Sequence, residues 1–195
     1  MAPQAARSKI ALRRAALARR DELSAAERAD RSAAIHRKAE PLMTALAPRC
    51  VSGFLPIGSE CDPQPLMAAL RDQGATIALP AFEDRQTIVF RSYDEAAPLV
   101  PAGFGTRQPP PSAPVVSPDT LLVPLVGFDR DSGRLGYGKG HYDRAIATMR
   151  ASGAAPHLVG IAFAVQEVDP IPLEPHDIRL DWVVTDAEVL DFRGR

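Results

Sequence analysis

Residues 121–144 have the sequence LLVPLVGFDRDSGRLGYGKGHYDR, in which an apolar run leads through a glycine-rich turn into a more polar segment. Residues 121–126 are apolar almost without interruption, which is typical of a central strand covered on both faces. A helix is expected from about residue 140 to residue 152, and Gly153 supplies its C-terminal end. A buried strand joined to a helix in this way is a building unit of α/β folds.

The rest of the chain repeats this alternation of strands and helices. Two helices are expected within about residues 5–47, and the second starts with the capping-box pattern of Ser24 and Glu27. A third helix is expected from Asp62 and Pro63 to near Gly74. Further strands are expected at residues 51–55, 76–79, 87–91, 157–163 and 182–184. The alternation predicts an α/β fold with a parallel or mixed sheet between helices.

Composition narrows the class of protein. The chain has 195 residues, enough for one domain, and its net charge of −1 favours neither nucleic acid nor a membrane surface as partner. No segment approaches the roughly 18 consecutive apolar residues that a membrane span needs. Cys50 and Cys61 lack metal-site spacing, and two thiols fit a reducing cytoplasm. An organellar presequence stays an alternative, because residues 1–20 are rich in Ala and Arg and contain no acid.

Residues 133–144 combine the features that a polyphosphate requires. Glycines let backbone N–H groups approach an anion, the start of a helix adds free donors, and Arg134 and Lys139 add positive charge. A Walker A loop would need Ser or Thr where Gly140 stands, and a dinucleotide loop would need glycine where His141 stands. The segment therefore predicts a phosphate-binding loop of neither type.

Two carboxylates are candidate ligands for Mg²⁺. Asp143 lies one turn into the expected helix, on the side of the phosphate loop, and Asp177 is a possible second ligand from a distant loop. Each has an alternative interpretation that stays open. Asp143 could only stabilise the positive end of its helix, and Asp177 could only be a turn residue.

The run from residue 124 to residue 144 resembles the signature of the 5-formyltetrahydrofolate cyclo-ligase family, also called methenyltetrahydrofolate synthetases. Lys9 and Arg13 stand in the K-x-x-x-R pattern of the family, and residues 54–56 with Glu60 are similar to its substrate-pocket segment. His176, Asp177 and residues 181–185 are similar to its C-terminal segment. The resemblance covers almost the whole chain in the expected order.

The resemblance implies a three-layer α/β/α fold formed by residues 1–195 as one domain, with ATP as co-substrate and Mg²⁺ as cofactor. It implies the ATP-dependent cyclisation of 5-formyltetrahydrofolate to 5,10-methenyltetrahydrofolate, with release of ADP and phosphate. ATP would phosphorylate the formyl oxygen, and N10 would then attack the activated carbon. The chemistry is consistent with the residues, because phosphoryl transfer requires mainly positioning and neutralisation of charge. A cytoplasmic monomer that acts on small molecules is expected.

The resemblance also assigns roles to single residues. It implies that Lys139, Arg134 and Asp143 are catalytic and that Asp143 and Asp177 bind the metal. ATP would be held by Lys9, Arg13, Arg134, Leu135, Gly136, Tyr137, Gly138, Lys139, Gly140, His141 and Tyr142. The folate would be bordered by Leu55, Glu60, Phe104, Tyr137, Gly138, Lys139, Gly140 and His141.

Two segments bear on how the folate is enclosed. His141 stands where many family members carry tyrosine, and Lys139 where many carry glycine. Seven prolines in residues 98–118 predict a long irregular loop, a kind of segment that is often functional. Phe104 in this loop is expected to cover the pterin, and the loop could close over the substrate as a lid.

Several side chains have structural interpretations that stay open beside the functional ones. Lys9 and Arg13 could form a solvated basic stripe on their helix. Glu60 could cap the helix that follows it, and Arg134 could bridge to Asp131 in its turn. His141 could be an ordinary polar residue of the first helical turn, and Tyr137 and Tyr142 could be packing residues.

Two functions other than cyclisation also stay open. A catalytically silent relative would bind folate or nucleotide as a regulator, and His141 is the feature that favours it. A small-molecule kinase built on the same loop would release a stable phosphorylated product instead of inorganic phosphate, and similarity of fold alone does not exclude it.

Overall fold

The computed structural model describes residues 8–102 and 105–194. Its central sheet has seven strands in the order β11-β10-β9-β6-β1-β2-β3. The five inner strands are parallel: β1 (Cys50–Ser52), β2 (Thr76–Phe82), β6 (Thr120–Pro124), β9 (His157–Ile161) and β10 (Trp182–Val184). The edge strands β3 (Ile88–Ser92) and β11 (Val189–Asp191) are antiparallel to their neighbours. The sheet is thus mixed with a parallel centre.

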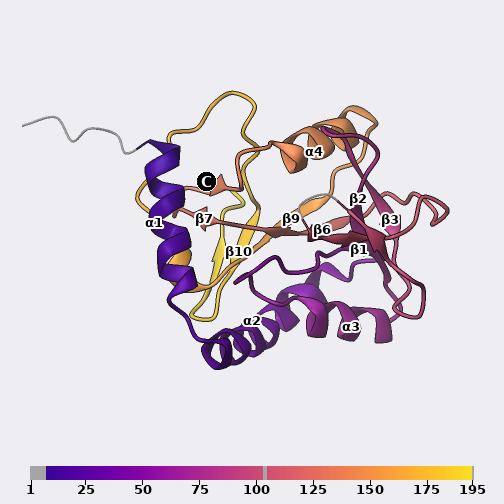
Figure 1. The fold of residues 1–195 in the computed structure, drawn as a ribbon, viewed down its shortest axis with the longest axis horizontal. Helices are drawn as coiled ribbons and strands as arrows, with labels where there is room; N and C mark the ends of the chain where they lie inside the picture. Colours follow the sequence, from indigo (N-terminus) through magenta and orange to yellow (C-terminus); the bar gives the residue numbers. More distant parts are fainter. Residues whose placement is uncertain (1–7, 103–104, 195) are drawn as a thin grey trace, which may run out of the picture.

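Helices cover both faces of this sheet (Figure 1). The helices α2 (Ala25–Leu46) and α3 (Gln64–Asp72) lie on one face, and α4 (His141–Ala151) lies on the other. Side chains of β6 alternate between the two cores: Leu122 packs with the first pair of helices, whereas Leu121 and Val123 pack with α4. The expected three-layer α/β/α fold is confirmed, and the apolar run 121–126 does contain a central strand, although β6 ends at Pro124.

The first helix, α1 (Lys9–Asp21), lies beside one end of the sheet (Figure 1). Its buried residues Leu12 and Ala16 form a small third core with Val126, Leu135 and Ile171. Two of these partners flank or belong to the hairpin of β7 (Gly127–Phe128) and β8 (Arg134–Leu135), which leads into the phosphate loop. Packing on this hairpin therefore brings one face of α1 next to the glycine-rich segment.

Local signals placed most elements correctly and missed some ends. The capping box of α2 is formed, since Glu27 N donates to Ser24 Oγ at 3.2 Å and Ser24 N donates to Glu27 Oε2 at 2.8 Å. Asp62 Oδ1 accepts from Gln64 N at 2.9 Å at the start of α3. The expected strand 51–55 was too long, because β1 ends at Ser52. The chain leaves the sheet at Gly53, where a Cβ atom would lie 2.3 Å from Met67 Sδ.

The proline-rich segment 98–118 is less irregular than expected. It contains the short hairpin of β4 (Val100–Pro101) and β5 (Arg107–Gln108) and a single bridge between Arg91 and Val115. Gln108 Oε1 also accepts a hydrogen bond of 2.9 Å from the backbone of β2. Phe104 lies outside the described residues. Within the described part of the chain, no helix is both long enough and apolar enough to cross a membrane.

Candidate active site

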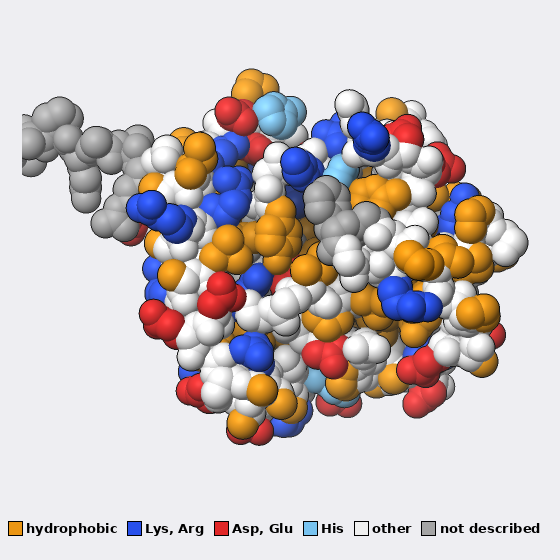
Figure 2. Space-filling view, in the orientation of Figure 1, with side chains coloured by type: hydrophobic (Ala, Val, Ile, Leu, Met, Phe, Trp, Pro, Cys, Tyr) orange, Lys and Arg blue, Asp and Glu red, His pale blue; other side chains and the backbone are white. Residues whose placement is uncertain are grey.

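A cavity of about 770 Å³ opens where the parallel strands end. Leu55 follows β1, Phe82 ends β2 and Pro124 ends β6, and all three line the cavity. The carboxyl ends of parallel strands are the usual place for ligands in open α/β sheets. Figure 2 shows this face of the molecule, where Lys and Arg side chains border exposed apolar surface near the centre.

Every predicted site residue that the structure describes lines this one cavity. They are Lys9, Arg13, Leu55, Glu60, Arg134, Leu135, Gly136, Tyr137, Gly138, Lys139, Gly140, His141, Tyr142, Asp143 and Asp177. Residues far apart in the sequence thus meet at one place.

Other lining residues were missed. They include Ile57, Leu79, Pro80, Phe82, Ile88, Arg107, Gln108 and Glu174. The apolar members carry no signal that separates a cavity wall from a core, since strands facing either have the same apolar character.

Arg13 of α1 binds the backbone of the phosphate loop. Arg13 Nε donates a hydrogen bond of 2.7 Å to the carbonyl of Gly136. Gly138 and Gly140 have φ angles of 85° and 65°, in the left-handed region that glycine adopts readily, and Gly140 is the N-cap of α4. The loop therefore ends at the free N–H groups of a helix start, where an anion is stabilised.

The two cationic side chains of the loop have different surroundings. Lys139 is exposed at the cavity and forms no ion pair with the described residues. Arg134 is buried, and it donates to Asp143 Oδ1 at 2.6 Å and to the carbonyl of Ile178 at 3.1 Å. Burial lowers the pKa of Arg134, and the carboxylate of Asp143 opposes that shift. The alternative bridge from Arg134 to Asp131 is wrong.

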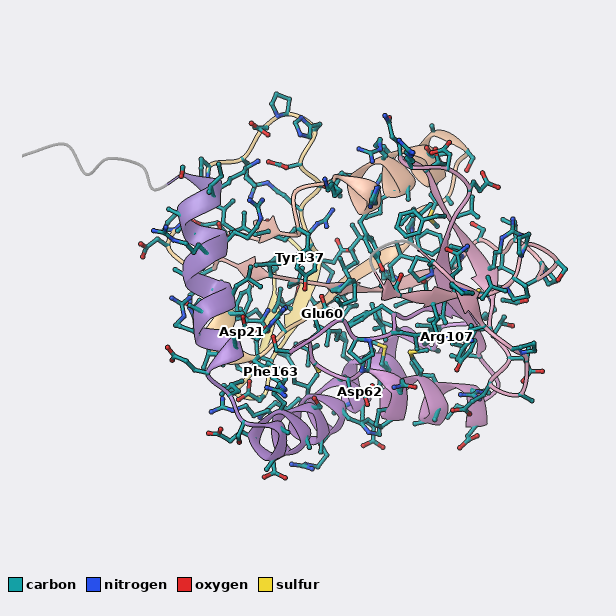
Figure 3. All side chains as sticks on the ribbon, in the orientation of Figure 1. Asp21, Glu60, Asp62, Arg107, Tyr137 and Phe163 are labelled. Carbon is teal, nitrogen blue, oxygen red and sulfur yellow. The ribbon has the colours of Figure 1, made fainter. Side chains whose placement is uncertain are left out.

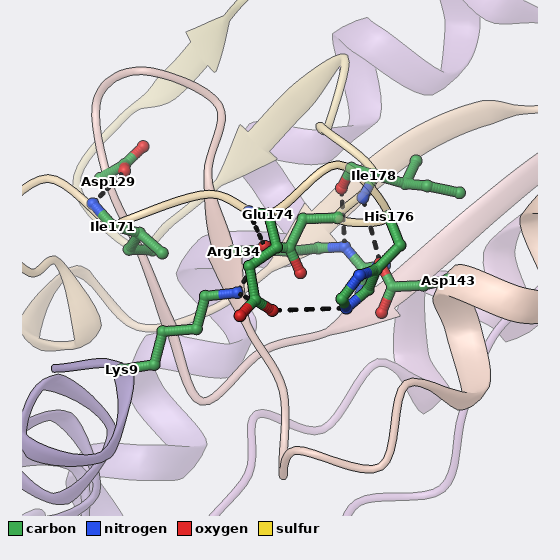
Figure 4. Close-up of polar contacts among 9 residues, drawn as sticks. Lys9, Asp129, Arg134, Asp143, Ile171, Glu174, His176 and Ile178 are labelled. Atoms are coloured by element: carbon green, nitrogen blue, oxygen red, sulfur yellow. Dashed lines mark hydrogen bonds and ion pairs between the residues drawn. The ribbon is translucent and has the colours of Figure 1, made fainter.

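Lys9 joins α1 to the C-terminal segment (Figure 4). Its Nζ lies 2.5 Å from Asp177 Oδ2 and 3.1 Å from Glu174 Oε2. Burial acts to raise the pKa of Asp177, but hydrogen bonds from Lys9 and from the backbone of Glu174 leave that pKa below its usual value. The interpretation of Lys9 and Arg13 as a solvated stripe is wrong, since both make polar contacts within the cavity wall.

The carboxylates proposed for Mg²⁺ leave oxygens available. Asp143 Oδ1 accepts from Arg134 and from the backbone of Ile178, and Asp177 Oδ2 accepts from Lys9 and from the backbone of Glu174. Asp143 Oδ2 and Asp177 Oδ1 have no hydrogen-bond partner among the residues that the structure describes. Carboxylate oxygens are the ligands that Mg²⁺ prefers, so the donor set fits this ion. Potential ligand atoms of Glu174, His176 and Asp177 also lie within 4.8 Å of one another.

Glu60 is a buried carboxylate that lines the cavity and lies near Tyr137 (Figure 3). Its Oε2 accepts from the backbone of Ile57 at 2.9 Å, and its Oε1 accepts from the hydroxyl of Tyr137 at 3.0 Å. Burial raises the pKa of Glu60, although both hydrogen bonds and the nearby Arg20 guanidinium oppose the shift. Glu60 makes no bond to α3, so the capping interpretation is wrong.

The aromatic residues of the loop differ in their contacts. Tyr137 is 47% exposed, yet its hydroxyl bonds to Glu60, so it is more than a packing residue. The ring of Tyr142 packs near Phe90, with 6.4 Å between the ring centres. The Tyr142 hydroxyl is buried and has no hydrogen-bond partner among the described residues. His141 packs edge-on against Phe82, and its Nε2 lies 3.3 Å from the carbonyl of Arg85.

Comparison with known proteins connects this chain to one family. The model of the 5-formyltetrahydrofolate cyclo-ligase family matches residues 5–186. The chain is 33% identical over 188 residues to a 5-formyltetrahydrofolate cyclo-ligase of Mycolicibacterium smegmatis, covering 92% of this chain and 94% of the relative. It is also 33% identical over 148 residues to the Escherichia coli K12 protein of the same name, covering 73% and 80%.

Solved structures show the same relationship. The 5,10-methenyltetrahydrofolate synthetase of Aquifex aeolicus superposes with a TM-score of 0.80 at 30% identity, covering 96% of this chain and 94% of that one. The enzyme of the same name from Mycoplasma pneumoniae gives a TM-score of 0.75 at 25% identity, covering 92% and 99%. In sequence and in fold, the chain belongs to the 5-formyltetrahydrofolate cyclo-ligase family.

Proposed function

We propose that this chain closes 5-formyltetrahydrofolate to 5,10-methenyltetrahydrofolate, using ATP and releasing ADP and phosphate. Its membership of the cyclo-ligase family supports the reaction. The observation that carries the proposal is that the residues expected around folate and the phosphate loop line a single cavity of about 770 Å³. One cavity lets the formyl oxygen and the terminal phosphate of ATP meet, as a direct phosphoryl transfer requires.

Each ligand has a suitable part of the cavity. Polyphosphate would lie on the N–H groups of residues 138–142, between Lys139 and Arg13. The pterin ring would lie on the apolar wall that includes Leu55 and Phe82. Glu60 would accept N–H donors of that ring, because an ionised carboxylate only accepts hydrogen bonds. Phe104 is proposed to cover the ring from segment 98–118, which would then act as a lid.

The reaction needs positioning and neutralisation of charge. The formyl oxygen attacks the terminal phosphorus of ATP, the bond to ADP breaks, and the oxygen becomes a phosphate leaving group. N10 then attacks the formyl carbon and loses its proton to solvent, and phosphate departs as the methenyl bridge forms. Lys139 and Arg134 stabilise negative charge on the transferred group. The ion pair of Arg134 with Asp143 fixes the guanidinium beside the loop.

Mg²⁺ is proposed to be held by the available oxygens of Asp143 and Asp177. When bound, it would neutralise charge on the phosphate oxygens. Lys9 already contacts Asp177, so this lysine is placed to set the orientation of the carboxylate.

The domain organisation, oligomeric state and cellular compartment of the enzyme are also part of the proposal. We infer that residues 1–195 form one domain that works as a monomer in the cytoplasm, on small molecules, without nucleic acid or membrane partners. Cys50 and Cys61 are both free thiols, which fits a reducing compartment. The near-zero net charge of −1 gives no general attraction to nucleic acid.

The test is the absorbance of 5,10-methenyltetrahydrofolate in mixtures of protein, 5-formyltetrahydrofolate, ATP and Mg²⁺. We expect a rise that needs all components and is abolished by EDTA. Asp143→Asn should lose most of the rate and should need higher Mg²⁺, while Asp131→Asn, an exposed change of the same type, should match the unmodified chain. Circular dichroism would check that both variants fold.

The two other functions, a silent binding relative and a small-molecule kinase, would give different results in the same reaction mixtures. Binding of folate or ATP without a rise in absorbance would indicate a silent relative. Formation of ADP together with a stable phosphorylated folate, and without free phosphate, would indicate a kinase.

A further inference from the structure

Arg20 is a buried arginine on the inner face of α1. It lies in line with Leu12 and Ala16, at positions i, i+4 and i+8, where an apolar residue is expected. Its side chain is only 3% exposed. Burying a guanidinium is costly unless the group is paired and hydrogen-bonded, so its partners indicate why this position carries charge.

The guanidinium connects the two segments that border the folate end of the cavity. Its Nε donates to Ser59 Oγ at 2.9 Å, and its Nη2 donates to the hydroxyl of Tyr137 at 3.1 Å. Its Nη1 lies 4.0 Å from Glu60 Oε1 and has no hydrogen bond with the described residues, although the atom is buried. Arg20 thus contacts the segment of Ser59 and Glu60 on one side and the phosphate loop on the other.

With Glu60 ionised, the donors and acceptors of this group can be arranged in one way only. Arginine donates and never accepts, so the oxygen of Tyr137 accepts from Arg20 and the single tyrosine proton goes to Glu60. A carboxylate has about four acceptor positions, of which Tyr137 and the Ile57 N–H take two. The others remain for a ligand that carries paired N–H donors.

The charge of Arg20 also favours the ionised form of Glu60, in which both carboxylate oxygens accept hydrogen bonds. Burial raises the pKa of Glu60, and the Arg20 guanidinium is among the groups that oppose this rise. A protonated Glu60 would become a donor at one oxygen and would lose part of its capacity to accept.

We propose that Arg20 is a positioning residue for the folate, which holds the Glu60 carboxylate and the Tyr137 hydroxyl as an oriented acceptor group. The proposal rests on the proposed function, since it takes Glu60 as the contact for the pterin. Arg20 acts through Glu60, since it is not one of the described residues that line the cavity.

The test is a double-mutant cycle in the ring-closure assay. Arg20→Met should raise the KM for 5-formyltetrahydrofolate about tenfold or more, the effect of weakening one buried charged hydrogen-bond acceptor, and leave the KM for ATP within about twofold. Glu60→Gln should give a loss of the same kind. The double variant should be no worse than Glu60→Gln alone by more than about twofold, because Arg20 then has no carboxylate to orient. Additive losses would overturn the proposal.

Arg19 provides the matched control. It lies on the same turn, and its guanidinium donates to the carbonyls of Val165 and Glu167, each at 2.6 Å, so it anchors α1 away from Glu60. Arg19→Met should lower stability and leave the folate KM within about twofold. An equal rise in folate KM for Arg19→Met would show that anchoring of α1 explains the effect, and would refute the role of Arg20.

A second variant covers the case in which Arg20→Met does not fold. Arg20→Lys keeps the charge but has one donor nitrogen in place of the two that contact Ser59 and Tyr137, so its folate KM should be higher than that of the unmodified chain. If the unmodified chain binds 5-formyltetrahydrofolate without closing it, the proposed function fails, and the same comparison is made with equilibrium Kd values. A Kd that does not change in Arg20→Lys, or no folate binding at all, would overturn the proposal.

Discussion

Asp129 is a buried carboxylate, and its replacement should destabilise the backbone segments that support the candidate active site. Its Oδ1 accepts from the backbone N–H groups of Asp131 at 2.9 Å and Gly133 at 2.8 Å. Its Oδ2 accepts from the backbone N–H of Ile171 at 2.8 Å (Figure 4). The first two bonds shape the turn before Arg134. The third ties this turn to the segment that continues to Asp177. Asp129 therefore links the supports of both proposed metal ligands.

The cost of Asp129→Asn follows from these three bonds. An asparagine oxygen in the Oδ1 position can keep the two bonds of the turn, but its NH₂ group then faces the N–H of Ile171. One buried donor left unsatisfied costs about 1–3 kcal/mol, and exchanging a charged for a neutral acceptor weakens the other two bonds by about 1 kcal/mol each. The neutral amide costs less to bury, which offsets part of this loss. The expected net loss is about 2–3 kcal/mol.

The loss in free energy of unfolding can be measured by urea denaturation, monitored by tryptophan fluorescence and circular dichroism. A chain of this size should lose roughly 2–4 °C in Tm per kcal/mol, so the melting temperature should fall by roughly 4–12 °C. Asp131→Asn is the control, because Asp131 is exposed and its side chain has no polar partner among the described residues; it should stay within about 0.5 kcal/mol. A loss below about 0.5 kcal/mol for Asp129→Asn, or an equal loss for both variants, would refute the reasoning.

Three further predictions test the backbone, the core and a thiol. Gly138→Ala should lower the free energy of unfolding by about 1–2 kcal/mol, since alanine is strained at a φ of 85°. Gly136→Ala should lower it less in the same urea titration, because Gly136 has no positive φ and an added Cβ would meet no atom within 4 Å. Equal losses for the two variants would contradict this prediction. Gly160→Ala should destabilise the chain by about 1–3 kcal/mol, because the added Cβ would lie 2.7 Å from Leu180 Cδ1 and 2.8 Å from Leu125 Cδ1. Adding the substitution Leu125→Val should recover part of the lost stability. If no stability is recovered, the steric explanation is wrong. Burial raises the pKa of the Cys61 thiol to about 12, so its reaction with a maleimide at pH 7.5 should be far slower in the folded chain than in urea. The labelling of each cysteine can be followed by peptide mass spectrometry. Labelling of Cys61 as fast as that of the half-buried Cys50 would contradict this prediction. The pH dependence has a definite sign, since the native labelling rate of Cys61 should keep rising with pH above the ordinary thiol range, up to its raised pKa, for as long as the chain stays folded.

The sequence determined those features that depend on residues close together in the chain. The capping box of α2, the buried central strand and the loop-to-helix junction at Gly140 follow from short patterns, because hydrogen bonds between neighbours and side-chain periodicity create them. The order of motifs also indicated the family and most cavity residues.

The tertiary structure decided which side chains meet and what they do there. Lys9 and Asp177 form an ion pair across 168 positions of sequence, and Arg20 reaches Tyr137 across 117 positions. Charge and periodicity alone favoured a solvated basic stripe for this helix. Whether an arginine on a helix faces water or a carboxylate depends on what packs against that helix, and only the folded arrangement of α1, β8 and the segment before α3 supplies this information. Asp129 was missed for the same reason, since its third partner, Ile171, comes next to it only when the chain has folded.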